Sequence, residues 1–113
     1  MDATTLAALG EPSRLRIVEL MRDHPFAVGD IAEELAIRQP QVSKHLRVLR
    51  EAGIVTVEAS ARQRIYRLQA APFEEIGTWV ASFERQWETR LYALGTYLGS
   101  LGEATKPREG ETR

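Results

Sequence analysis

The fold is decided by residues 40–51, which read PQVSKHLRVLRE. At about 100° per residue, Val42, Leu46 and Leu49 fall within one narrow arc of a helix, so these apolar side chains are expected to face the core. Most polar and basic side chains of the segment fall outside this arc. Pro40 suits the first turn of a helix, where its missing N–H costs nothing. The segment therefore predicts an amphipathic helix with a polar, basic outer face.

Three shorter helices and a brief strand are expected before this one. The first helix covers 3–9, the second opens at Pro12, and the third covers 30–36. A very short strand at 26–28 separates the last two. Because only a brief turn joins the third helix to the helix described above, residues 30–51 predict a helix-turn-helix.

A β-hairpin is expected after the helix-turn-helix, over 54–69. Strand-forming residues lie on both sides of a polar tip at 59–63. They are Val55, Val57, Ile65, Tyr66 and Leu68. Helix-turn-helix followed by a hairpin, or wing, is a DNA-reading architecture. The expected fold class is therefore mainly α with a small β-hairpin, a winged helix-turn-helix.

A long helix is expected over 72–101, because its apolar residues recur at steps of three and four that average 3.5. They are Phe73, Ile76, Val80, Phe83, Trp87, Leu91, Leu94, Leu98 and Leu101. An unbroken helix of this length spans about 44 Å at ~1.5 Å per residue. Glycines at 77, 95 and 99 leave two helices as an alternative. Little chain remains to cover the apolar seam, so a second copy is the expected partner. Residues 105–113 are expected to be a disordered tail.

The charge of the chain is unevenly distributed. Seven basic and two acidic residues lie between Arg38 and Arg67, a net charge of +5, whereas the remaining residues carry −6. A basic central segment flanked by acidic segments favours a surface that binds a polyanion. Chance clustering of basic residues on a solvated surface is the alternative.

The polar face of the 40–51 helix carries side chains suited to DNA. Gln41 can donate to and accept from adenine, whereas Lys44 and Arg47 can reach guanine or phosphate. An ordinary amphipathic surface helix is the competing interpretation. At the hairpin tip, Arg62 and Arg64 are better candidates for DNA contact than Arg67. For Arg64 and Arg67, a place on the strand face is an alternative. A solvated turn is the alternative there.

Composition excludes several other classes of function. The chain has no cysteine, which removes disulfides and thiolate metal sites. His45 has no second histidine near it, so no metal site and no cofactor are expected. Ser43 and His45 point in different directions on a helix, so no nucleophile–base pair forms and no enzyme is expected. No apolar run is long enough to cross a membrane, and the N-terminus lacks the features of a signal peptide, which favours a cytoplasmic protein.

Three ordered blocks resemble the ArsR-type (ArsR/SmtB) family of winged-helix repressors. They are residues 6–17 (LAALGEPSRLRI), 41–55 (QVSKHLRVLREAGIV) and 62–68 (RQRIYRL). The resemblance covers roughly Leu6 to Leu68. The pattern around Trp79 and Trp87 is similar to a metal-independent subgroup, whose genes often lie beside genes for START-like proteins.

The resemblance implies a homodimer that represses a promoter by binding an imperfect inverted repeat. Its terminal helices, 3–9 and 72–101, would form the dimer interface, and Arg14 would match a common family arginine. The DNA-binding residues expected from sequence and resemblance together are Gln39, Gln41, Ser43, Lys44, His45, Arg47, Arg50, Arg62 and Arg64. The residues expected at the dimer interface are Leu6, Leu9, Phe73, Ile76, Trp79, Val80, Phe83, Trp87, Leu91, Leu94 and Leu98.

The sequence departs from the family pattern in two places. Family members often carry glycine at the wing tip, where this chain has residues 59–61 (ASA), so a looser tip is expected. Many members sense metals through cysteine in the third helix or histidine in the last, and this chain has neither.

Residues 1–104 are thus expected to form one domain, a DNA-binding regulator with double-stranded operator DNA and a second copy of itself as partners. Two alternatives stay open. A winged helix can serve protein contact, which predicts an apolar or acidic recognition face. A regulator of another family would respond to a ligand bound in a pocket near Trp79 and Trp87.

Overall fold

A computed structural model describes residues 1–105 of the chain, and the last residues of the expected tail, 106–113, lie outside this range. The chain divides into two compact units, Met1–Ile76 and the residues from Gly77 onward. The first contains every element up to the end of the hairpin and the start of the long helix. The second contains the remainder of that helix. The single domain expected over 1–104 stays a prediction.

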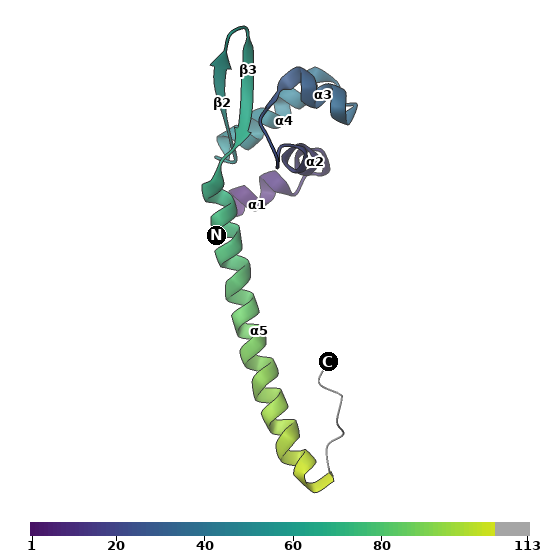
Figure 1. The fold of residues 1–113 in the computed structure, drawn as a ribbon, viewed down its shortest axis with the longest axis vertical. Helices are drawn as coiled ribbons and strands as arrows, with labels where there is room; N and C mark the ends of the chain where they lie inside the picture. The colour runs from purple at the N-terminus through teal and green to yellow at the C-terminus, as the bar shows by residue number, and fades with distance from the viewer. Residues whose placement is uncertain (106–113) are drawn as a thin grey trace. The chain divides into compact units, whose positions relative to one another are not determined.

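The first unit opens with four helices and a short strand, as predicted. They are α1 (Ala3–Leu9), α2 (Pro12–Leu20), β1 (Phe26–Ala27), α3 (Val28–Leu35) and α4 (Gln39–Glu51). Gly53 follows α4 with φ of +78°, a left-handed conformation that glycine adopts without steric cost. The helix-turn-helix is α3 and α4 (Figure 1). Its bounds differ from the prediction by one residue at the start of α4, two at the start of α3 and one at the end of α3.

The core of the first unit lies between the helices and the base of the sheet. Val42, Leu46 and Leu49, the apolar arc of α4, are fully buried, which confirms the helical periodicity. They pack with Ile17 of α2 and Ile31 of α3. The apolar face of α4 is therefore packed against α2 and α3, and its opposite face is held toward solvent.

The hairpin consists of β2 (Val55–Ser60) and β3 (Gln63–Leu68), and it forms a three-stranded antiparallel sheet with β1 in the order β1-β3-β2. The β2–β3 hairpin extends away from the helices (Figure 1), and both strands become more exposed toward the tip. Its base is anchored by Val55, which is buried.

The expected loose tip is wrong for this hairpin. Strand pairing continues to Ser60 and Gln63, which leaves only two residues in the turn. Ala61 takes the role of the absent glycine, with φ of 55°. An alanine in this region carries steric strain, and the paired strands on both sides hold it there. The predicted tip at 59–63 is thus shorter than expected because the strands extend into it.

The final helix, α5, covers Ala70–Thr105 and is continuous through Gly77, Gly95 and Gly99. It begins two residues earlier and ends four residues later than predicted, and the alternative of two separate helices is wrong. Thr105, expected in the tail, is its last residue. Among residues 1–105, no helix is long and apolar enough to cross a membrane.

Candidate nucleic-acid interface

The outer face of α4 carries most of the predicted DNA-binding residues. The helix is held by its buried seam, so the side chains on the other arcs are presented to solvent. Six of the predicted DNA-binding residues are exposed on α4: Gln39, Gln41, Ser43, Lys44, Arg47 and Arg50. Arg38 precedes the helix and gives no side-chain cap, so the first backbone N–H groups of α4 have no capping side chain.

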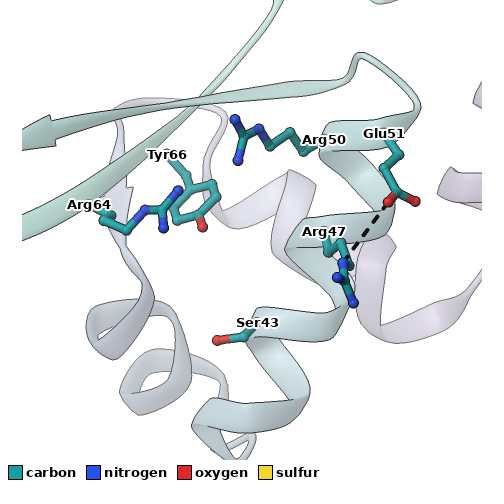
Figure 2. Close-up of a pocket in the computed structure, with 6 residues that line it drawn as sticks. All are labelled: Ser43, Arg47, Arg50, Glu51, Arg64 and Tyr66. Carbon is teal, nitrogen blue, oxygen red and sulfur yellow. Dashed lines mark ion pairs between the residues drawn. The ribbon is translucent and has the colours of Figure 1, made fainter.

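An open hollow lies between α4 and β3. It has a volume of about 440 Å³ and is lined by Ser43, Arg47, Arg50, Glu51, Arg64 and Tyr66. Figure 2 shows Ser43 and Arg50 reaching the hollow from α4, while Arg64 and Tyr66 reach it from β3. The structure thus brings four predicted residues, Ser43, Arg47, Arg50 and Arg64, from two distant parts of the sequence to one place.

A second open hollow, of about 530 Å³, shares part of this lining. Ser43, Arg64 and Tyr66 belong to both hollows. The second one adds Arg62 and Gln63 from the tip, Gln39 from the start of α4 and residues 27–29 around the start of α3. Together the two hollows follow the space between the hairpin and the helix-turn-helix.

The basic side chains of this surface differ in how far they are neutralised. Arg47 lies 4.0 Å from a carboxylate oxygen of Glu51, but both side chains are more than 70% exposed, so the pair is weak. Arg67 donates a 2.6 Å hydrogen bond to Glu58, so its charge is compensated. In the described part of the chain, no carboxylate lies within 4.0 Å of Arg50, Arg62 or Arg64. This supports the ranking of Arg62 and Arg64 above Arg67.

His45 is placed apart from the other predicted residues. Its Nδ1 lies 3.6 Å from Oε2 of Glu11 at the start of α2, and its side chain is 22% exposed. Arg14, next to this pair, donates from Nε to the carbonyl oxygen of Ala8 at 2.7 Å, so it braces α1 against α2. His45 lines neither hollow, and its contact with DNA stays a prediction.

Tyr66 is the functional candidate that the sequence did not single out. It was noted only as a strand former, and its position in β3, opposite Phe26 and Val57, agrees with that. Its ring is half-buried against the core cluster, while the residue lines both hollows. The signal available in the sequence was its place between two arginines, Arg64 and Arg67.

Among the side chains that the structure describes, no cluster of histidine, cysteine or carboxylate groups could hold a metal ion.

The predicted dimer residues differ in how far they are exposed. Leu9 and Phe73 are partly buried and pack against the core of their own chain. Six seam residues of α5 are 44–60% exposed. They are Val80, Phe83, Trp87, Leu91, Leu94 and Leu98. Of the remaining predicted residues, Ile76 is partly covered, whereas Leu6 and Trp79 are each 37% exposed. Trp79 packs edge-on against Phe83, with ring centroids 5.1 Å apart.

Comparison with known proteins decides the family. Residues 11–57, which include the helix-turn-helix, match the family model described as bacterial regulatory protein, arsR family. The chain is also 32% identical over 98 residues to the HTH-type transcriptional regulator Rv2034 of Mycobacterium tuberculosis, which covers 87% of this chain and 89% of that protein. The chain belongs to the ArsR family. This ArsR-family protein is therefore a regulatory protein rather than an enzyme, as the sequence predicted.

Two further relatives are named repressors. The ArsR-family chain is 44% identical over 66 residues to the biofilm growth-associated repressor of Agrobacterium fabrum, covering 58% of this chain and 56% of that one. The crystal structure of the transcriptional repressor BigR from Xylella fastidiosa is 33% identical, with a TM-score of 0.60 over 72% of this chain and 83% of that chain. These similarities confirm the winged-helix fold.

Proposed function

We propose that this protein is a transcriptional repressor that binds an inverted-repeat operator in double-stranded DNA as a homodimer. The observation that carries the proposal is the basic surface between α4 and the hairpin, where Arg50, Arg62 and Arg64 keep uncompensated charges. A helix that presents exposed polar and basic side chains beside a basic wing suits the major groove and the adjacent backbone.

The names of the relatives support repression, because two of them are repressors. The exposed apolar seam of α5 supports a dimer, since a second copy would remove it from water. Residues 1–104 would then act as one functional domain in the cytoplasm, the compartment that contains the promoter DNA. Two α4 helices would enter successive major grooves about 34 Å apart.

The test is binding to the DNA upstream of the protein's own gene, measured by gel shift and footprinting. Lys44→Ala combined with Arg47→Ala should weaken binding by roughly 10- to 100-fold, because two cationic contacts are lost. Arg22→Ala also removes one positive charge, but Arg22 follows α2 and belongs to neither α4 nor the hairpin. This control should bind as the wild type does.

A protected inverted repeat that is lost in the double variant would support the proposal. Absence of specific and salt-sensitive binding by the wild type would contradict it and favour the alternative of a protein-contact module. That alternative fits poorly with α4, because its outer face is basic rather than apolar or acidic.

A further inference from the structure

The hollow of about 440 Å³ between α4 and β3 has a composition unlike that of the rest of the α4 face. Two hydroxyl groups, on Ser43 and Tyr66, line it together with the guanidinium groups of Arg50 and Arg64. Figure 2 shows these four side chains directed toward the same space from the two elements. Hydroxyl and guanidinium groups are all hydrogen-bond donors.

The charge balance of this hollow favours an anion. Its single acidic residue, Glu51, lies next to Arg47, which leaves Arg50 and Arg64 without a carboxylate partner among the side chains that the structure describes. Arginine forks that accompany hydroxyl donors suit the oxygens of a phosphate group. Guanine also offers two acceptors to an arginine, but adenine and cytosine present amino donors and thymine a methyl group, so four donors in one place suit the backbone of any sequence better than a base edge.

The residues best suited to read bases lie outside the hollow. Gln41 and Lys44 are exposed on α4, and neither lines either hollow. The side of α4 that faces the hairpin is thus chemically distinct from the part that carries these two residues.

We propose that Ser43, Arg50, Arg64 and Tyr66 form a phosphodiester site that holds the backbone of one DNA strand between α4 and the wing. The site supplies affinity that does not depend on sequence, and base readout is left to residues such as Gln41 and Lys44. This inference rests on the proposed function, because it assigns parts of the same DNA-binding surface.

The test compares operator and scrambled duplexes by fluorescence anisotropy over a range of salt concentrations. Arg50→Gln and Arg64→Gln should each weaken binding to both duplexes by the same factor, and each should reduce the slope of log K against log salt by about 0.9. Tyr66→Phe removes only a neutral donor and keeps the half-buried ring, so the fold is preserved. It should weaken both duplexes by roughly 3- to 10-fold and leave the slope unchanged.

Two matched variants complete the test. Arg67→Gln combined with Glu58→Gln removes an ion pair from the same hairpin and leaves its net charge unchanged, so binding should stay at the wild-type level. Gln41→Ala should reduce binding to the operator much more than binding to the scrambled duplex.

The outcomes separate this inference from the proposed function. If the wild type binds its operator but Arg50→Gln and Tyr66→Phe change nothing, or affect the operator alone, the phosphodiester site is wrong and the proposed function stands. If the wild type binds no operator, the proposed function fails first. Calorimetry with inorganic phosphate at matched ionic strength should show no saturable binding. Saturable binding that Arg64→Gln abolishes would assign the hollow to a free anion instead and overturn the inference.

Discussion

Oε2 of Glu11 lies 3.6 Å from Nδ1 of His45, so the first residue before α2 meets the middle of α4. The same carboxylate accepts hydrogen bonds from the backbone N–H groups of Ser13 and Arg14, at 3.2 and 3.0 Å. Glu11 therefore caps α2 and also contacts the helix that carries the DNA-binding side chains. A carboxylate at a helix N-terminus is further stabilised by the helix dipole.

Stability should depend on the ionisation of Glu11. The backbone N–H of Ser13 is the largest cause that lowers the pKa of Glu11 below its ordinary value of 4.5, and the N–H of Arg14 and the charges of His45 and Arg14 act in the same direction. A carboxyl whose pKa is lower in the folded state adds stability above pH 4.5, and this stability is lost as the pH falls through the folded value.

We expect Glu11→Gln to lower the thermal midpoint at pH 7 and to make it less sensitive to acid. The difference from the wild type should shrink as the pH falls below 4.5, because the wild-type carboxylate is then neutralised. Glu19→Gln changes an exposed carboxylate on the same helix and serves as the control. A difference that stays constant across this pH range would contradict the assignment.

The core of the first unit should respond strongly to truncation of α4. Leu46 is fully buried, so Leu46→Ala should lower the free energy of unfolding by about 2–5 kcal/mol. Val48 lies on the same helix but is 37% exposed, and Val48→Ala should stay within about 0.5 kcal/mol of the wild type. Urea denaturation at one fixed protein concentration measures both, since association would make stability depend on concentration. Equal losses of unfolding free energy in the two variants would contradict the assignment of Leu46 to the buried face of α4.

The end of α3 offers a site where stability should increase. Ala36 follows α3 with φ of 55° and ψ of 43°, and its N–H donates to the carbonyl oxygen of Ala32. A glycine adopts this conformation without the steric cost that alanine carries, although it loses more backbone entropy on folding. Ala36→Gly should therefore raise the free energy of unfolding by about 0.5–1 kcal/mol.

The matched control for this variant lies within the same helix. Ala32→Gly places glycine in a helical conformation, where it should lower the free energy of unfolding by about 1 kcal/mol. Opposite signs for the two substitutions would support the left-handed cap. A loss of stability in both would indicate that residue 36 is not left-handed in solution.

Local periodicity was sufficient to predict most elements and the buried face of α4. Val42, Leu46 and Leu49 recur at helical spacing, and the arrangement of neighbours along one helix follows from that spacing alone. The same reasoning separated Gln41 and Lys44 from the core. Element ends moved by only a few residues.

The rest depended on contacts between distant parts of the chain. β1 pairs with β3, so Phe26 lies opposite Tyr66, and no local pattern predicts this register. The two hollows depend on how the hairpin is placed relative to the helices, so that Arg64 of β3 and Ser43 of α4 line the same space. The tight turn at Ala61 was missed for a related reason: the paired strands enforce a conformation that alanine alone would avoid.

The seam of α5 gives the sharpest test of association, because it offers two adjacent exposed residues with opposite expectations. Leu91 is 60% exposed and lies on the seam, four residues after Trp87 and three before Leu94. Tyr92 is 79% exposed and is turned away from Leu91 by about 100°. Both side chains therefore reach solvent in a single chain, but only Leu91 belongs to the proposed interface.

Leu91→Glu should convert the dimer to a monomer at micromolar concentration, since each copy would bury an unpaired carboxylate and dimerisation should weaken by at least about 100-fold. Tyr92→Glu adds the same charge to the same helix and should remain a dimer. Sedimentation velocity measures both, and the Leu91→Glu monomer should also lose binding to the inverted repeat, because two α4 helices no longer act together. If Leu91→Glu stays dimeric, α5 does not carry the interface. If the wild type is already a monomer, the symmetric model of operator binding fails.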